Sequence, residues 1–186
     1  GSKSHQHISD ALTVLENMEH RGACGCDANS GDGAGIMIQT PHEFFFDECV
    51  KLGVHLPSFG KYGVGVIFFP KEIRLREECR EIFNRRAEIL GLEILAYRKI
   101  PVNTSDIGPT ALSVEPEMEQ VFIACPDHIS DPEEFERKLF VLRNFASHTI
   151  LNTVKKDEIG FYIASLSYKT IVYKGQLTST QVRKYF

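Results

Sequence analysis

The chain has 186 residues, of which 42% are hydrophobic, and a formal net charge of −4; these values are ordinary for one globular domain, long enough to bury roughly 70% of its unfolded surface. The negative charge argues against a nucleic-acid partner, and the lack of a signal-peptide pattern or of an apolar run near ~20 residues argues against a membrane partner. Five cysteines without small-scaffold spacing predict reduced thiols in a cytoplasmic protein.

The first predicted element is an amphipathic helix over residues 8–19, whose apolar side chains have the spacing of one helix face. Ser9 is its predicted N-cap, and Gly22 stands where a C-terminal glycine stop belongs. Residues 1–6, which open with Gly1-Ser2, are expected to be a tag remnant and a loop.

Residues 20–35 form a glycine-rich segment with five glycines, two cysteines, two aspartates and a His-Arg pair. Such a density of glycine indicates backbone that takes positive φ or lets another group approach closely. Polar groups on a loop between rigid elements are often functional. The alternative is a solvated connection between helix and strand.

The rest of the chain alternates between predicted strands and helices. The predicted strands cover residues 36–38, 62–69, 92–98, 120–125, 159–167 and 170–174, and the helices cover 44–52, 71–90 and 132–151. Thr40-Pro41-His42-Glu43 is typical of a capping box, and Asp131 of an N-cap. Residues 99–118 are predicted to be a long ordered loop, and the last two strands to form a hairpin.

Alternation of strands with long helices, followed by a hairpin, favours an α/β (α+β) fold with mixed sheets and packed helices. An all-parallel sheet and a sandwich of sheets alone fit less well. Because residues 1–186 show no repeat and no linker, we expect a single domain.

Two parts of the chain carry a family resemblance. His20-Arg21-Gly22 is followed by Gly31-Asp32-Gly33-Ala34-Gly35, and Ser165-Leu166-Ser167 by Thr170-Ile171-Val172-Tyr173-Lys174-Gly175. Together they resemble the N-terminal class II glutamine amidotransferase domain of the glutamate synthase large subunit, an N-terminal-nucleophile hydrolase with a four-layer αββα sandwich. The middle of the chain resembles the family only in its order of elements.

The resemblance implies an enzyme that releases ammonia from glutamine for reductive transfer to 2-oxoglutarate, giving glutamate. It implies FMN and an iron–sulfur cluster elsewhere in the parent enzyme, and no cofactor in this part. The implied partners are glutamine, the remaining domains of the large subunit and a reductase subunit. The electron donor (NADPH, NADH or ferredoxin) and the oligomeric state stay open.

The family's catalytic machinery predicts what this chain lacks. Class II amidotransferases use the thiol of an N-terminal cysteine as nucleophile and its α-amine as general base. Here Gly1 stands at the terminus, no cysteine precedes Cys24, and no His-Gln-Arg-Phe or His-Asn-Gly string occurs. The resemblance therefore implies an inactive fragment without a catalytic residue, lacking the first strand and the C-terminal part of the domain. Such a fragment is expected to self-associate through unpaired strand edges.

Five residues are carried over from the family as neighbours of the active site. His20, Arg21 and Gly22 match the turn beside the nucleophile, where Arg21 is expected to act as a fixed charge that shapes the pocket. Asp32 and Gly33 match the second half of the same loop. Asp32 either positions that turn or is an ordinary turn residue. His20 and Arg21 also suit the C-terminal end of a helix dipole.

Cys24 and Cys26 have several interpretations. With His20 and Asp27 nearby they could form half of a metal site, but no second Cys/His pair stands at zinc-site spacing, so no metal is expected. Either cysteine could be a nucleophile with His20 as base. The default interpretation is a buried or loop thiol, and it applies to Cys49, Cys79 and Cys125 as well.

Two rival functions remain at this point. The chain could be a non-catalytic scaffold or regulatory module of the same fold that has lost its nucleophile. It could also belong to a different class II amidotransferase, since these enzymes share the arginine-glycine turn.

Treatment of the 186-residue polypeptide with a glutamine-mimicking diazo-ketone, which alkylates class II nucleophiles, is expected to leave its intact mass unchanged. Glutamine hydrolysis by the same polypeptide should not exceed the buffer background. A single adduct that maps to Cys24 or Cys26 would contradict this, because the nucleophile would then lie within the glycine-rich segment.

Overall fold

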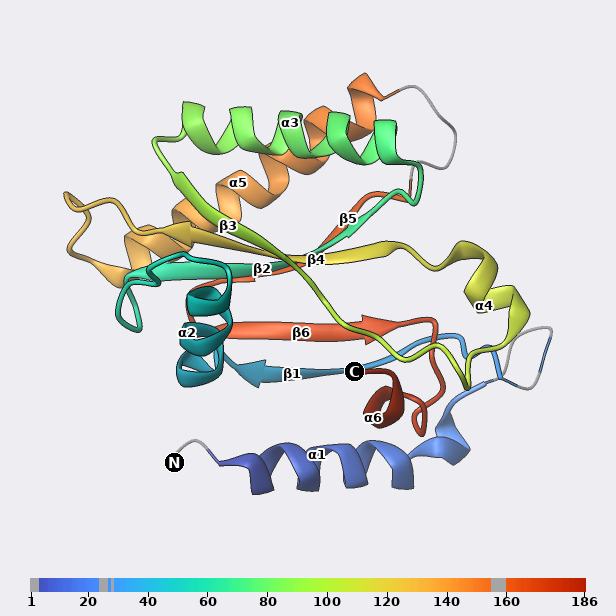
Figure 1. Cartoon of the computed structure of the whole chain (residues 1–186). Coiled ribbons are helices and arrows are strands. Elements are labelled where there is room, and N and C mark those ends of the chain that lie inside the picture. Colours follow the sequence, from blue (N-terminus) through green and yellow to red (C-terminus); the bar gives the residue numbers. More distant parts are fainter. Residues whose placement is uncertain (1–3, 24–26, 28, 155–159) are drawn as a thin grey trace. The chain divides into compact units, whose positions relative to one another are not determined.

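The computed structural model describes residues 4–23, 27, 29–154 and 160–186, which belong to two compact units. The first unit covers residues 1–39, 101–115 and 172–186, and the second covers residues 40–100 and 116–171. Figure 1 labels the helices and strands of both units. The glycine-rich segment belongs to the first unit.

The second unit contains a four-stranded sheet in the order β3-β4-β2-β5. The strands span Glu93–Lys99 (β3), Glu117–Ala124 (β4), Tyr62–Phe69 (β2) and Tyr162–Ser167 (β5). All three pairings are antiparallel. The predicted strand over residues 62–69 is confirmed, and it lies between two other strands, as its nearly continuous apolar sequence indicates.

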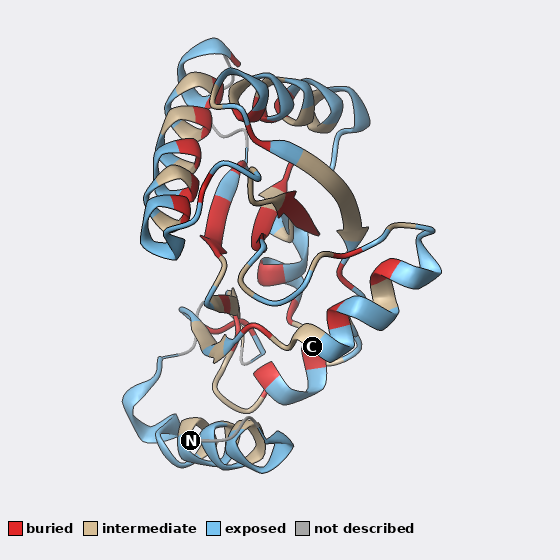
Figure 2. Ribbon diagram, turned by 90° about the vertical axis from the view of Figure 1, so that its left-hand side faces the viewer, coloured by how far each residue is buried: buried red, intermediate tan, exposed pale blue. Residues whose placement is uncertain are grey.

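Two helices, α3 (Ile73–Ile89) and α5 (Pro132–Thr153), pack on this sheet and on each other. Figure 2 shows buried residues on the sides of both helices that face the sheet. Because apolar residues recur every three or four positions, each helix buries one stripe. The shared core contains Cys79, Phe83 and Ala87 of α3, Phe135, Leu139, Leu142, Ala146 and Ile150 of α5, and Ile67, Phe69, Val121, Ile123 and Ile163 of the sheet.

Helix α5 approaches the sheet closely at Gly63. A β-carbon on this glycine would lie only 2.5 Å from Cδ1 of Leu139, which is fully buried. The glycine therefore makes room for the leucine, as expected for a glycine within a central strand. At its N-terminus, the predicted Asp131 cap is confirmed, because its carboxylate accepts a hydrogen bond of 3.0 Å from the backbone N–H of Glu133.

Helix α2 (His42–Lys51) follows the predicted capping box but does not use it. Pro41 is the N-cap and makes no side-chain capping bond. Thr40 lies one residue too early and is buried, with its N–H bonded to the carbonyl of Lys169. Two contacts hold α2: Phe45 meets Phe122 edge to face at 5.2 Å between ring centroids, and the Glu48 carboxylate accepts hydrogen bonds from Arg98 of β3.

The predicted hairpin of the last two strands is wrong. β5 pairs with β2, whereas β6 (Thr170–Gly175) pairs with β1 (Ala34–Gln39) in a separate two-stranded sheet. The turn between β5 and β6 is closed by side chains, since the hydroxyl of Ser167 accepts hydrogen bonds from the N–H groups of Lys169 and Thr170. The carboxylate of Glu136 accepts the N–H of Tyr168. The chain thus leaves one sheet and enters the other.

The first unit contains α1 (His5–Asn17), the 3₁₀ turn η1 (Glu19–Arg21), β1, α4 (Pro109–Val114), α6 (Val182–Tyr185) and most of β6. The predicted N-cap Ser9 is wrong, because α1 begins at His5 within the expected tag remnant and loop, and Ser4 caps it by accepting the N–H of Gln6. The helix buries none of its residues fully.

The predicted long loop over residues 99–118 is also incorrect. Its middle forms α4, and its end belongs to β4. Gly108-Pro109 is the local signal for that helix, since proline is favoured at the first helical position. The six-residue helix is too short to show an apolar period, so its existence depends on contacts from elsewhere.

The α/β class with packed helices is therefore confirmed. No helix in the described part of the chain combines the length and the apolar character needed to cross a membrane.

Replacement of Phe83 by alanine is expected to destabilise the protein by about 3–5 kcal/mol, because a large buried ring is lost and a cavity remains. Ile89→Ala on the same helix is the control, since Ile89 is 62% exposed and Phe83 is fully buried; its effect should stay within about 0.5 kcal/mol. Urea unfolding measures both. Equal losses would contradict the orientation of α3.

Candidate functional site

The predicted active-site turn follows α1 directly. η1 carries His20 and Arg21, and Gly22 leaves the turn in extended conformation, with its N–H bonded to the carbonyl of Glu19. The His20 ring lies 3.1 Å, measured from Nδ1, from the carbonyl oxygen of Asn17. His20 and Arg21 are exposed, so the turn presents them to solvent on a short element of fixed geometry.

The backbone brings the two halves of the predicted site together. The N–H of Asp32 donates to the carbonyl of Ala23 at 3.3 Å, which joins the Gly-Asp-Gly half to the residue after the turn. Asp32 and Gly33 are exposed as well. Cys24 and Cys26 lie outside the described residues, so the structure does not test their interpretations.

Two glycines of the loop are required by a close approach of residues 173–178. A β-carbon on Gly31 would lie 2.2 Å from the backbone carbonyl of Leu177, and one on Gly35 would lie 2.5 Å from the carbonyl oxygen of Tyr173. Gly33 has a φ of 141°, which side-chain-bearing residues rarely adopt. Gly31 and Gly35 are therefore needed for close contact with residues 173–178, and Gly33 is needed for its positive φ.

The loop also caps α4. The carboxylate of Asp27 accepts the N–H of Thr110 at 3.2 Å and the hydroxyl of Ser30 at 2.9 Å. The Ser30 hydroxyl accepts the N–H of Ala111 at 3.0 Å. These are first-turn amides that a side chain on the neighbouring N-cap residue usually satisfies, and the N-cap here is Gly108, which has none.

Asp27 is held as a carboxylate by this arrangement. Hydrogen bonding from Thr110, with a further contribution from Ser30, keeps the pKa of Asp27 below its ordinary value of 3.8. Because the pKa is lower in the folded state, the ionised carboxylate stabilises the folded loop fully at pH values above 3.8, the ordinary pKa. The contribution is lost as the pH falls through the lower pKa of the folded state.

Sequence reasoning missed the residues that support the loop. Asp27, Ser30 and Gly108 act together although they come from two distant segments. Gln181, which is 4% exposed, donates from its carboxamide to the carbonyl of Asn29 at 2.8 Å. In the sequence Gln181 follows Thr178-Ser179-Thr180 and precedes Val182, so no local pattern marked it as buried, and its partners could not be read from spacing.

The described cysteines are free thiols, of which Cys49 and Cys79 are buried and Cys125 is partly buried. Burial raises the pKa of each, to about 11 for Cys79. A raised pKa suppresses the nucleophilic thiolate. Among residues 4–23, 27, 29–154 and 160–186, no three His, Cys, Asp or Glu side chains gather as a possible metal site.

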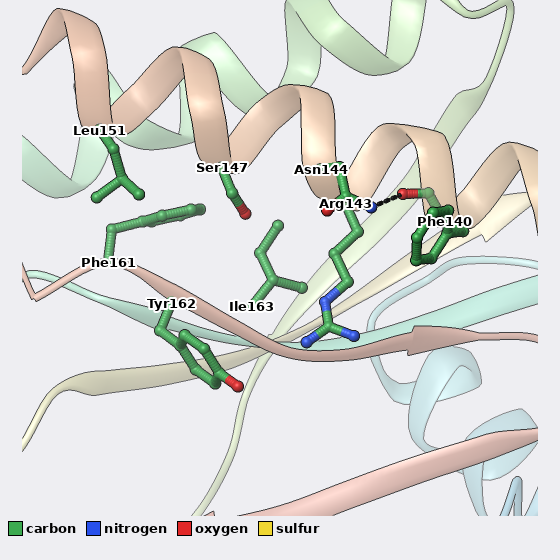
Figure 3. A pocket seen from close by; sticks show the side chains of 8 residues that line it. All are labelled: Phe140, Arg143, Asn144, Ser147, Leu151, Phe161, Tyr162 and Ile163. Carbon is green, nitrogen blue, oxygen red and sulfur yellow. Dashed lines mark hydrogen bonds between the residues drawn. The ribbon is translucent and has the colours of Figure 1, made fainter.

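The second unit has a surface groove of about 400 Å³ between α5 and β5. Figure 3 shows the guanidinium of Arg143 reaching down toward β5 among mostly apolar and neutral polar side chains. The lining residues are Phe140, Arg143, Asn144, Ser147, Leu151, Phe161, Tyr162 and Ile163. Among the lining residues that the structure describes, no histidine or carboxylate accompanies Ser147 as a base. None of the five predicted site residues lines it.

A family profile and individual relatives both match the chain over its whole length and indicate the same family. The sequence profile of the class-II glutamine amidotransferases matches residues 1–186. The chain is 44% identical to "Glutamate synthase [NADH]" of Schizosaccharomyces pombe and 38% identical to "Glutamate synthase [NADPH] large chain" of Bacillus subtilis, in each case over 100% of the chain. Over 95% of the chain it is 36% identical to "Ferredoxin-dependent glutamate synthase 2, chloroplastic" of Arabidopsis thaliana. The chain spans 9%, 12% and 11% of these relatives.

Ser30→Ala is expected to cost about 1 kcal/mol, the usual loss for a helix cap, and to expose the amide of Ala111. Hydrogen exchange at that amide should become faster. Ser113→Ala is the matched control on α4, because Ser113 is exposed and its hydroxyl donates to the carbonyl of Thr110 within the same helix.

Hydrogen exchange in the unmodified protein, measured as a function of pH, tests the hydrogen bond between the Asp27 carboxylate and the amide of Thr110. Protection of the Thr110 amide should fall as the pH drops below 3.8, the ordinary pKa of the carboxyl.

The Ser30→Ala variant also has an outcome that would contradict the capping of α4 by the loop. If hydrogen exchange at the Ala111 amide were the same in this variant as in the unmodified protein, α4 would not depend on the Ser30 hydroxyl.

Proposed function

We propose, since the chain belongs to the family of class-II glutamine amidotransferases, that it is part of the glutaminase domain of a glutamate synthase. The observation that carries this proposal is the match of residues 1–186 to the family, together with relatives that are all named glutamate synthases in the comparison above. The two compact units are then parts of one domain, because a single family profile covers both.

The proposed reaction has two stages. Glutamine and water give glutamate and ammonia, through attack of a cysteine thiol on the side-chain amide. Ammonia, 2-oxoglutarate, two electrons and two protons then give a second glutamate and water. In the proposed enzyme, FMN and an iron–sulfur cluster in other domains supply the electron transfer. The relatives are named for NADH, NADPH and ferredoxin, so the electron donor and any reductase subunit stay open.

Within this chain, we assign the glutamine-site role to the His20-Arg21-Gly22 turn. Arg21 is exposed and stands on η1, so it can offer a fixed positive charge to a polar substrate. Asp32 and Gly33 are assigned to positioning. The hydrogen bond between Asp32 and Ala23 supports this, because it ties the second half of the loop to the end of the turn. The nucleophile is not assigned to a residue of this chain.

The cytoplasmic location expected from the thiols stays a prediction, because one of the relatives is named as chloroplastic.

The proposed function is tested with amide-¹⁵N glutamine, 2-oxoglutarate and a reductant, supplied to the whole protein of which this chain is a part. The expected product is glutamate with ¹⁵N at its α-amino group. Ammonia release without 2-oxoglutarate consumption would identify a different class II amidotransferase. No turnover would favour a non-catalytic module.

Arg21→Ala in the same protein is expected to lower kcat/KM for glutamine by about tenfold or more, whereas Arg21→Lys should lose less because it keeps the charge. Glutamate synthesis from added ammonia should not change, since ammonia bypasses the glutamine site. Arg74→Ala is the control, because Arg74 is an exposed arginine on α3. A loss of the ammonia-supported rate in Arg21→Ala would contradict the assignment.

A further inference from the structure

We infer that Gln181 is a positioning residue for the glutamine site, acting through the glycine-rich loop. The inference rests on the proposed function, which assigns that site to the loop. It concerns a residue that belongs to neither motif, lies 152 positions from its partner Asn29 in the sequence and is not expected to touch the substrate.

Gln181 satisfies its whole carboxamide in a place with little access to water. Nε2 donates to the carbonyl of Asn29 at 2.8 Å and to the carbonyl of Asp106 at 2.6 Å. Oε1 accepts the N–H of Thr178 at 2.8 Å. The residue is 4% exposed, so few water molecules could replace these partners. One side chain thus ties together the glycine-rich loop, the segment before α4 and the chain's final segment.

The carbonyl of Asn29 is the point at which this tie acts on the loop. It also accepts the N–H of Gly108 at 2.9 Å, so its oxygen has two donors. Asn29 lies between Asp27 and Ser30, which cap α4, and two residues before Gly31, which packs against Leu177. Fixing this carbonyl therefore fixes the peptide two residues before Gly31, where the Gly31-Asp32-Gly33 half of the predicted site begins.

The residues that follow Gln181 also attach the chain's final segment to the rest of the first unit. Arg183 donates to the Glu16 carboxylate at 2.7 Å and to the carbonyl of Ser9, both on α1, the helix that leads into the His20 turn. Figure 1 shows α6 beside α1. Lys184 pairs with Asp106 at 2.7 Å. Gln181 consequently acts from an anchored segment, which is a requirement for positioning another loop.

Only a carboxamide fits these three contacts. It offers two donors and one acceptor, whereas a glutamate side chain would set a carboxylate against two carbonyl oxygens. Methionine has a similar length but no strong hydrogen-bonding group. Gln181→Met and Gln181→Glu therefore remove the donors with little change in volume.

The test uses the whole enzyme with Gln181→Met, Gln181→Glu and the matched control Gln176→Met, since Gln176 is an exposed glutamine five residues earlier. KM and kcat are measured for glutamine, together with the rate supported by added ammonia. Hydrogen exchange is followed by mass spectrometry in the peptide that covers residues 20–35. Both Gln181 variants are expected to raise KM for glutamine by about tenfold, with a smaller change in kcat. Exchange in the loop should become faster, and the ammonia-supported rate should stay the same.

Three results would overturn the inference. Unchanged KM and unchanged loop exchange would show that Gln181 does not position the loop. Equal loss of the glutamine-supported and ammonia-supported rates would show a general structural defect. An equal rise in KM and in loop exchange in Gln176→Met would show that the effect does not depend on the hydrogen bonds of Gln181. If the unmodified enzyme does not use glutamine, the proposed function fails separately, and loop exchange alone decides whether Gln181 holds the loop.

Discussion

The close approach between residues 31–35 and the backbone of residues 173–178 is the constraint on which the candidate site depends. It leaves no room for a β-carbon at Gly31 or Gly35. The loop can therefore pack backbone against backbone at these two positions. Asp32 is an exposed charged residue within this stretch, and its N–H is bonded to the carbonyl of Ala23, two residues after Arg21. A rigid support beneath exposed polar groups is what a binding site needs to hold a substrate in one orientation.

The support itself is built from hydrogen bonds between distant segments. Asp27 and Ser30 satisfy the first amides of α4, and Gln181 satisfies the carbonyl of Asn29. Each bond serves both partners, because the helix gains a cap and the loop gains an anchor. The site and its scaffold thus stabilise each other, and a change in one is expected to alter the other.

The second unit follows a different physical principle. Its stability comes from apolar burial between α3, α5 and the four-stranded sheet, where side chains such as Phe83 and Leu139 are completely removed from solvent. Cys79 belongs to this core, and burial raises the pKa of its thiol, which disfavours the thiolate. The five residues proposed for the glutamine site belong to the other unit, where the hydrogen bonds of Asp27, Ser30 and Gln181 hold the loop.

The sequence by itself determined the elements that depend on local periodicity, and the motif that identifies the family. The strand over Tyr62–Phe69, helices α3 and α5, and the Asp131 cap were all predicted, because each is set by residues a few positions apart. Only the tertiary structure decided that β5 and β6 join different sheets, that α4 exists, and what supports the loop. The supporting hydrogen bonds join residues 81, 83 and 152 positions apart. Such contacts form when the whole chain folds, so no local pattern records them.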